Sequence, residues 1–284
     1  MVNAVVLAGG KQKFGHYKSK AAVELNGRRC VDYVVEALDK AKYIDDIIIV
    51  GNVDNLGEKI YDYSVTHETR VFVHNAAVGY EHFRLKMGDK EPLFYIFSDI
   101  PFVTSQSIDD FLERADYNTD LNLCFVDINK INEKFSNYKE YYPYTRLNDF
   151  SFRMGNCGLV KVENVIKSGS QKVFQKAFEA RRFNEFLSLL KFLFLGYSIY
   201  SHLRDVRKFQ KTNLFGVPMI LPREFYFDLN IKDIEEKISR VFSKEGNLSV
   251  NIVKSYYPEL AVDIDTLKDK QYVENHPKFR NVIT

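Results

Sequence analysis

A loop rich in glycine and lysine follows the first apolar segment of the sequence. The residues from Val2 to Leu7 are mostly β-branched and apolar, which is typical of a buried strand. The chain then reads AGGKQKFGHYKSK, in which glycines let backbone N–H groups converge on an anion and lysines add positive charge. The spacing of Gly10 and Gly15 matches half of a Walker loop, but His16 and Tyr17 replace its Lys and Ser or Thr. The loop therefore predicts either a phosphate site outside the P-loop class or an ordinary turn with a solvated basic face.

Carboxylates at two further places could hold a metal ion. Asp99 directly follows the apolar run from Leu93 to Ser98, and open α/β sheets bind ligands at the carboxyl ends of their strands. Asp263 and Asp265 are two residues apart, so in an extended segment they point to the same side and can share one hard cation. Each pattern alone also fits a turn or a capped helix start. Together with a lysine-bearing glycine loop, they favour metal-assisted chemistry on a nucleoside triphosphate.

An alternation of strands and helices must position these groups. The predicted strands are Val2 to Leu7, Ile47 to Val50, Val71 to His74, Leu93 to Ser98 and Leu121 to Ile128. The predicted helices run from Val31 to Ala41, from Ala76 to Lys86, and onward from Ser107, where Asp110 stands at capping-box spacing. Residues 1–130 are therefore expected to form a three-layer α/β unit with a parallel sheet.

The second half of the sequence is less regular. Its expected elements are a hairpin from Tyr144 to Val162 around Gly155 and Asn156, a helical region from about Gln171 to Lys211, a helix from Asp228 to Phe242, a strand from Ser249 to Lys254 and a terminal helix. No Pro-, Gly- or Ser-rich linker interrupts the chain. We therefore expect residues 1–284 to be a single α/β domain with a helical insertion at about 170–215.

Composition narrows the function classes. The 284 residues include 40 Lys plus Arg and 38 Asp plus Glu, a net charge of +2, which argues against nucleic-acid binding. An odd number of cysteines, 3 in all, fits reduced thiols and a cytoplasmic protein, and the apolar amino-terminal segment is interpreted as a strand and not as a signal peptide. The 6 histidines lack zinc-site spacing. The apolar run from Phe186 to Tyr200 is shorter than the ~20 residues that span a bilayer. Basic residues at 181–208 surround a Phe- and Leu-rich body, so this region is expected to pack on its own sheet, with a membrane surface or a second subunit of a homodimer as the alternatives.

In five motifs the sequence resembles the MobA-like nucleotidyltransferases, within the sugar-phosphate nucleotidyltransferase superfamily. The motifs are Leu7-Ala8-Gly9-Gly10, the lysine segment that begins at Ser19-Lys20, Ser98-Asp99-Ile100-Pro101, the strand Met154 to Leu159, and AVDIDTLKDKQYVE at positions 261–274. They occur in the family's order and span most of the chain. The resemblance implies a GT-A-like, Rossmann-like α/β/α fold with a mostly parallel central sheet.

The resemblance also implies an activity and a set of site residues. The expected reaction transfers a nucleoside monophosphate from a nucleoside triphosphate to a phosphorylated small-molecule acceptor and releases pyrophosphate. Lys20 and Asp99 are the expected catalytic residues, and Asp99, Asp263 and Asp265 the expected Mg²⁺ ligands. The expected nucleotide- and substrate-binding residues are Leu7, Ala8, Gly9, Gly10, Lys11, Lys13, Gly15, Lys18, Lys20, Asn75, Gly79 and Asn156. Of these, Asn75 and Gly79 stand where such folds contact the base, and Asn156 on the acceptor side.

The glycine loop departs from the family pattern and leaves alternatives open. Gln12 and Phe14 replace a Gly and an Arg of that pattern; Lys11, Lys13 or Lys18 could replace the missing charge, but as a point cation and not as a bidentate fork. One alternative is a molybdenum-cofactor guanylyltransferase, and another is a catalytically silent nucleotide-binding module. A glycosyltransferase of the same fold is a further alternative, although the Asp99 motif lacks the second Asp of its usual D-x-D.

Overall fold

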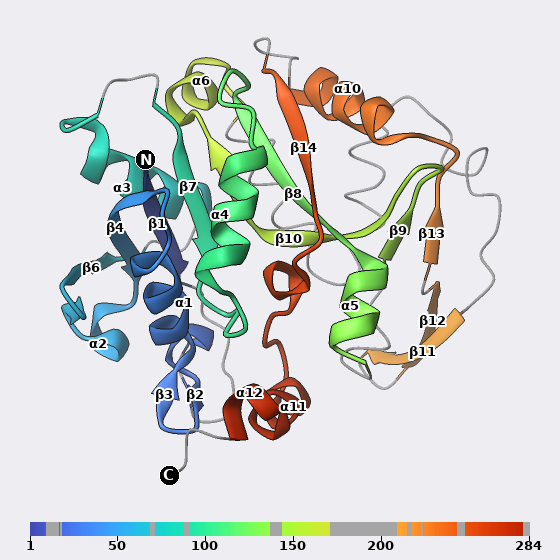
Figure 1. Cartoon of the computed structure of the whole chain (residues 1–284), viewed down its shortest axis with the longest axis horizontal. Coiled ribbons are helices and arrows are strands. Elements are labelled where there is room, and N and C mark those ends of the chain that lie inside the picture. The colour runs from blue at the N-terminus through green and yellow to red at the C-terminus, as the bar shows by residue number, and fades with distance from the viewer. Residues whose placement is uncertain are drawn as a thin grey trace.

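A mixed β-sheet with helices on both faces organises the chain (Figure 1). The computed structural model describes residues 1–9, 17, 19–68, 72–87, 91–136, 144–170, 209–214, 217–222, 224–242 and 248–280. The predicted loop residues Gly10, Lys11, Lys13, Gly15 and Lys18 lie outside these ranges, as do residues 171–208 of the predicted insertion. Among the described residues, no helix has the length and apolar character needed to cross a membrane.

Four parallel strands form the part of the sheet that carries the predicted motifs. They lie in the order β7 (Leu93–Phe97), β1 (Val2–Ala8), β4 (Ile44–Gly51) and β6 (Tyr63–His67), and β5 (Lys59–Ile60) pairs antiparallel with β6 at the edge. Parallel strands of this kind are buried on both faces, which explains the continuous apolar runs. Because these strands all point the same way, the segments that follow β1 and β7 leave the same edge of the sheet.

The other part of the sheet is joined through one antiparallel strand. Strand β10 (Ser151–Val160) pairs antiparallel with β7 and with β8 (Leu121–Asp127), and β8 pairs in parallel with β14 (Val250–Ser255). Strand β9 (Tyr144–Arg146) pairs with β10 and, in parallel, with β13 (Glu224–Tyr226). Strand β8 thus runs in the same direction as β7, as predicted, but the antiparallel strand β10 lies between them.

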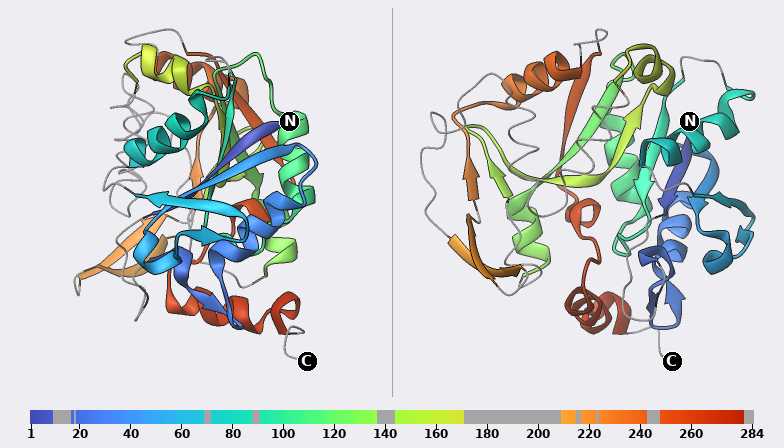
Figure 2. Two further views of the ribbon diagram at one scale, coloured as in Figure 1. Left: turned by 90° about the vertical axis from the view of Figure 1, so that its left-hand side faces the viewer. Right: turned by 180° about the vertical axis from the view of Figure 1, so that it is seen from behind.

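The sheet is covered by a helical layer on each side (Figure 2). One layer holds α1 (Cys30–Asp39), α4 (Ser105–Arg114) and α5 (Ile128–Lys134), and the other holds α3 (Phe72–Arg84), α6 (Val162–Lys167) and α10 (Ile231–Phe242). Strand β1 contributes to the apolar cores on both faces of the sheet, because Ala4 and Val6 pack in one core and Val5 and Leu7 pack in the other. This is the three-layer α/β/α architecture that the sequence predicts.

Short elements complete the described chain. They are the turn helices η1 (Lys20–Ala22) and η2 (Pro258–Ala261), the strand pair β2 (Glu24–Leu25) and β3 (Arg28–Arg29), and the helices α2 (Val53–Leu56), α11 (Leu267–Asn275) and α12 (Pro277–Arg280). Helices α11 and α12 lie below the sheet in Figure 1, near its strand-end edge. They follow directly on the segment that contains Asp263 and Asp265.

Three predicted elements differ from the structure: a strand and a helix start in the first half of the chain, and the turn of the hairpin. The predicted strand from Val71 to His74 is helical from Phe72, and β6 takes its place beside β4. Helix α4 begins at Ser105, because the hydroxyl of Thr104 accepts the backbone N–H of Ser107 at 3.2 Å. The predicted hairpin turn at Gly155 and Asn156 lies inside β10, and the chain turns at 147–150 instead.

The last residues of the predicted helical region form a β-strand and not a helix. Strands β11 (Phe209–Leu214) and β12 (Val217–Pro222) form an antiparallel pair, with Phe209 opposite Pro222. Residues 209–214 of the predicted helical insertion were therefore assigned to the wrong type of element. The segment FQKTNL has only two large apolar residues, so periodicity alone did not separate a helix from a strand.

Gly79 allows α3 to lie directly on β1. A Cβ added at Gly79 would stand 2.4 Å from Val5 Cγ1 and 2.8 Å from Cγ2. Gly79→Ala should therefore destabilise the protein by about 1–3 kcal/mol through overpacking, although Ala usually favours a helix over Gly by about 0.5–1 kcal/mol. Urea unfolding measures whether the free energy of unfolding falls, as overpacking predicts, or rises, as helix propensity alone would predict. His74→Ala on the exposed side of α3 is the matched control, and a Gly79→Ala protein as stable as wild type would contradict this packing.

Candidate active site

Lys20 connects two carboxylates that are far apart in the sequence. Its Nζ donates a hydrogen bond to Asp99 Oδ2 at 3.1 Å and a second one to Asp265 Oδ1. Lys20 begins η1 after the β1 loop, Asp99 follows β7, and Asp265 precedes α11. The side chains are 19%, 15% and 28% exposed, so the group is largely enclosed but still open to a ligand. The structure thus brings both predicted catalytic residues together.

Asp263 adds a third carboxylate to this group. Asp99, Asp263 and Asp265 each offer an oxygen atom, and these three atoms lie within 4.8 Å of one another. Asp263 and Asp265 share one side of their segment as expected, while the intervening Ile264 is fully buried. A set of carboxylate oxygens fits a hard cation such as Mg²⁺, which prefers oxygen ligands. The three predicted ligand residues are therefore close enough to share one ion.

The backbone holds the two carboxylate segments against each other. Ile264 N donates to Asp99 O at 2.9 Å, and its side chain packs with Phe102 and Val273 in an apolar cluster. Lys278 Nζ, from α12, donates to Phe102 O at 2.9 Å. The segments after β7 and before α11 are therefore fixed by contacts that do not use the three carboxylates.

The charges of the group perturb one another. Burial raises the pKa of Asp99, Lys20 lowers it, and Asp263 and Asp265 raise it again, with a net increase. Burial by itself lowers the pKa of Lys20, but attraction to Asp99, Asp265 and Asp263 outweighs it and leaves that pKa above its usual value. Lys20 therefore stays protonated, and its ammonium group is the cation that the structure places among the three carboxylates.

Asp269 fixes the segment that carries Asp265, and the sequence reasoning did not assign it a role. Its buried carboxylate accepts the backbone N–H of Asp265 at 2.9 Å and that of Thr266 at 2.8 Å. Thr266 in turn caps α11 by accepting the N–H of Asp269. The pattern Thr266-x-x-Asp269 is a capping box, a signal that was present in the sequence.

Asp269→Ala should lower both stability and turnover. It leaves two backbone N–H groups without an acceptor, which costs about 1–3 kcal/mol for a buried group, and it frees the backbone at Asp265. Asp269→Asn retains an acceptor oxygen at the same place and should restore most of the loss. Urea unfolding and turnover measure the two effects. Equal damage from the Ala and Asn variants would show that negative charge, and not backbone positioning, is what Asp269 supplies.

The end of β1 brings further predicted residues to this edge. Leu7 and Ala8 are buried, so their side chains belong to the core. A Cβ at Gly9 would stand 2.3 Å from Glu68 Oε2 and 3.0 Å from Asn75 Nδ2. Glu68 is thus a neighbour of the glycine loop that the sequence reasoning missed, because its contact with Gly9 depends on how β1 and β6 are arranged.

Two further residues predicted to bind substrate, Gly79 and Asn156, also make contacts within the fold. Gly79 faces Val5 in the middle of β1, one helical turn from Asn75, where it serves helix packing. Asn156 is buried on β10, and its Nδ2 donates to Leu260 O in η2 at 3.4 Å. Asn156 therefore helps to hold the segment that leads to Asp263.

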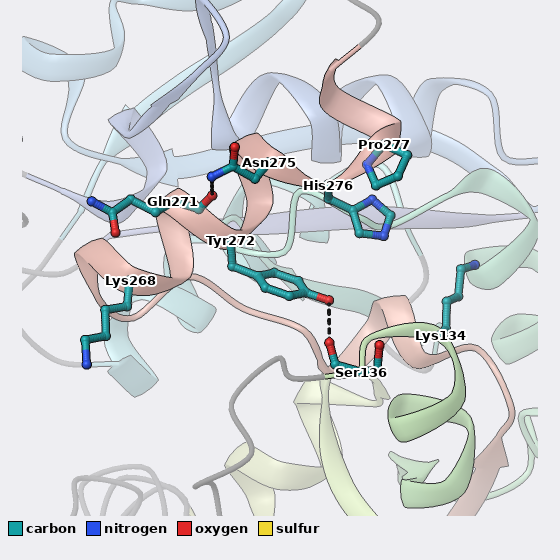
Figure 3. A pocket seen from close by; sticks show the side chains of 8 residues that line it. All are labelled: Lys134, Ser136, Lys268, Gln271, Tyr272, Asn275, His276 and Pro277. Carbon is teal, nitrogen blue, oxygen red and sulfur yellow. Dashed lines mark hydrogen bonds between the residues drawn. The ribbon is translucent and has the colours of Figure 1, made fainter.

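A shallow cavity of about 580 Å³ lies between the end of α5 and helices α11 and α12 (Figure 3). Lys134 and Ser136 line one side, and Lys268, Tyr272 and His276 line the other. The Tyr272 hydroxyl donates to Ser136 O at 3.2 Å across it. None of the predicted site residues lines this cavity, so it is separate from the carboxylate group.

Comparisons with known proteins agree with this architecture. The family model described as the MobA-like NTP transferase domain matches residues 4–240. A probable molybdenum cofactor guanylyltransferase from Thermococcus gammatolerans is 31% identical over 112 residues, which are 38% of this chain and 53% of that protein. The chain thus spans about half the length of this curated relative.

A solved structure extends the similarity in fold to nearly the whole chain. A hypothetical transferase from Thermus thermophilus superposes with a TM-score of 0.70 at 22% sequence identity, covering 95% of this chain and 99% of that one. The similarity between the two structures supports the fold. The residues matched by the family model include most of β1, Lys20, the Asp99 segment and β10. The chain therefore belongs to the MobA-like NTP transferase family, and its fold is the three-layer α/β/α type with a mostly parallel sheet.

Proposed function

We propose that the protein transfers a nucleoside monophosphate from a nucleoside triphosphate to a phosphorylated small-molecule acceptor and releases pyrophosphate. One observation carries this proposal: Lys20 and three carboxylates meet where β1 and β7 end. A cation-binding acidic group beside a lysine suits a polyphosphate, because the substrate brings several negative charges into one place. Family membership supplies the reaction type, and the site chemistry favours a charged acceptor.

The reaction needs charge neutralisation more than proton transfer. An acceptor phosphate oxygen attacks the α-phosphorus, a new P–O bond forms, and the bond to the β-phosphate breaks with its electrons leaving on pyrophosphate. An acceptor phosphate is already an anion near neutral pH, so no general base is required to generate the nucleophile. The protein must instead hold two polyanions together and in line.

The residues divide this work. Lys20 contacts the α- or β-phosphate through its ammonium group and offsets charge that develops on the leaving oxygen. A Mg²⁺ ion held by Asp99, Asp263 and Asp265 would supply further positive charge to the phosphates. Gly9 has no side chain, so its backbone lies directly against the side chains of Glu68 and Asn75 at the end of β1. Asn75, one of the few buried polar residues near this edge, is our candidate for contacting the nucleoside.

We also propose that the protein is cytoplasmic and that it forms one domain. Cys30, Cys124 and Cys157 are free thiols, which suits a reducing compartment such as the cytoplasm. One sheet includes strands from both halves of the chain, among them β1 and β14, which supports residues 1–284 as one domain.

A pyrophosphate-release assay tests the acceptor. Each of the five common nucleoside triphosphates is incubated with Mg²⁺ and a panel of sugar and polyol phosphates, and the matched controls are the same acceptors after phosphatase treatment. We expect pyrophosphate only when an NTP and an intact phosphorylated acceptor are both present. Equal release with dephosphorylated acceptors would contradict a phosphate nucleophile.

A molybdenum-cofactor guanylyltransferase is the second candidate. The observation that favours it is the 31% identity over 112 residues to a protein with that name. As its name says, this candidate requires a guanylyl donor such as GTP and the molybdenum cofactor as the acceptor. This function would be favoured over the first if GTP were the one nucleoside triphosphate that stabilises the protein, and if no sugar or polyol phosphate led to pyrophosphate release.

A further inference from the structure

The ammonium group of Lys20 lies where a metal ion would need to bind. It donates to Asp99 and Asp265, and both carboxylates also belong to the group whose oxygen atoms lie within 4.8 Å of one another. Lys20 is therefore not beside the acidic cluster but bonded to two of its three members. A divalent cation that takes both carboxylates must share them with a fixed positive charge or displace it.

The charges make sharing unfavourable. Three carboxylates so close together repel one another, and one ammonium group offsets part of this repulsion. A divalent ion binding to the same carboxylates would lie next to the ammonium group, and like charges in a partly enclosed site are weakly screened. Lys20 and the metal ion thus compete for Asp99 and Asp265.

The local structure allows the lysine side chain to move while its backbone stays in place. Val23 N donates to Lys20 O at 3.1 Å, and the neighbouring side chains of Ser19 and Ala21 are buried. The lysine side chain itself has a flexible four-carbon stem with a rotatable ammonium group. A change of partner from carboxylate to phosphate therefore requires rotation of one side chain and no rearrangement of η1.

We propose that Lys20 is an exchangeable counter-cation: it neutralises Asp99 and Asp265 until a metal–nucleotide complex arrives, and then transfers its ammonium group to the nucleotide phosphates. The first half, competition with the metal, stands on the contacts of Lys20. The second half, transfer to phosphate, rests on the proposed function. Exchange couples the two ligands, because a nucleotide that draws Lys20 away raises the metal affinity of the cluster, and the metal raises nucleotide affinity by the same factor.

Direct titration with Mn²⁺, followed by electron paramagnetic resonance without nucleotide, tests the competition. We expect Lys20→Gln to bind Mn²⁺ at least tenfold more tightly than wild type, because the competing charge is gone. Lys20→Arg keeps the charge and should bind no more tightly than wild type. Lys130→Gln, at an exposed lysine paired with Glu133, is the matched surface control and should change nothing. Unchanged or weaker binding by Lys20→Gln would overturn the proposal.

Two additions keep the result interpretable. The double variant Lys20→Gln/Asp99→Asn should lose the gained affinity, which assigns the metal to this cluster, and retention of the gain would place the metal elsewhere and overturn the exchange. If Lys20→Gln unfolds too easily for titration, its melting temperature in rising Mn²⁺ reports the same affinity, because a ligand of the folded state raises it.

The Mn²⁺ titration tests the competition whether or not nucleotidyl transfer is detected. Tighter Mn²⁺ binding by Lys20→Gln supports competition even if wild type transfers no nucleotide, in which case the proposed function fails and only the competition between Lys20 and the metal ion stands. Wild-type turnover combined with unchanged Mn²⁺ affinity in Lys20→Gln leaves the proposed function intact and overturns the exchange.

Discussion

Asp99→Asn is expected to lower the rate of nucleotidyl transfer by at least about 100-fold, the usual cost of removing one electrostatic group from a reaction centre. Asp99 lies at the end of β7, accepts a hydrogen bond from Lys20, and is close enough to Asp263 and Asp265 to share a cation with them. Asn has nearly the same shape but no charge, so it removes a metal ligand and the ion pair with Lys20. Turnover under saturating Mg²⁺ and substrate measures the effect.

The fold should survive this substitution. The backbone oxygen of Asp99 still accepts the N–H of Ile264, and Lys20 keeps its bond to Asp265. Burial already disfavours the charged form of Asp99, as its raised pKa indicates, so a neutral side chain relieves a desolvation cost. Asp45→Asn, at an exposed position of β4, is the matched control and should keep full activity. A folded Asp99→Asn protein with more than about a tenth of the wild-type rate would remove Asp99 from the metal site.

Lys20→Gln is expected to reduce turnover by about 100- to 1,000-fold, since it removes the cation assigned to the α- or β-phosphate. Lys20→Arg should retain part of the rate, because charge is kept while the geometry of a point cation is lost. The same Lys20→Gln protein should bind Mn²⁺ more tightly, so activity and metal affinity move in opposite directions. A purely structural lysine would lower both together.

Melting curves of the Lys20 variants separate catalysis from stability. Loss of Lys20 leaves Asp99 and Asp265 without their cation, so Lys20→Gln should melt earlier than wild type in metal-free buffer and gain more from added Mg²⁺. Rates are then compared at a temperature where every variant is folded. A Lys20→Gln protein that is fully folded and turns over at the wild-type rate would contradict the role assigned to Lys20.

The parts of the fold with strong local patterns could be predicted from the sequence. Strands β1, β4 and β7 are central and buried, so their apolar runs are long, and both ends were placed to within a few residues. Strand β6 was missed because it is short and buries only Val65, which leaves little hydrophobic signal. The apolar residues that follow it in the sequence begin α3, and they were mistaken for the strand.

The errors around β10 have a tertiary cause. Gly155 was interpreted as a turn glycine, but a Cβ there would stand 2.5 Å from Cys124 Sγ on the adjacent strand β8. The pairing of β10 with β8 shifts register between Met154 and Gly158, so Gly155 marks a close approach within the sheet. A single sequence does not show which strand will lie beside such a glycine.

The site was predictable in its residue types and less so in its contacts. Lys20, Asp99 and the Asp263–Asp265 pair stand in recognisable motifs, and the structure brings them together. The bond from Lys20 to Asp265 joins positions 245 residues apart, and it depends on the fold as a whole. Asp269 was missed although its capping pattern is local, because the capped helix start considered for this segment was linked to Asp263 and Asp265 and not to Asp269.

A thermal-shift panel of ATP, GTP, CTP, UTP and dTTP, with and without Mg²⁺, on wild type and Asp99→Asn tests whether Asp99 belongs to a nucleotide–metal site. A nucleotide at 100 times its dissociation constant should stabilise the folded protein by about 2.7 kcal/mol. A nucleotidyltransferase site at Asp99 predicts that one triphosphate or more raises the melting temperature of wild type, only with Mg²⁺, and that Asp99→Asn does not respond. Stabilisation by no triphosphate, or equal stabilisation of Asp99→Asn, would contradict it.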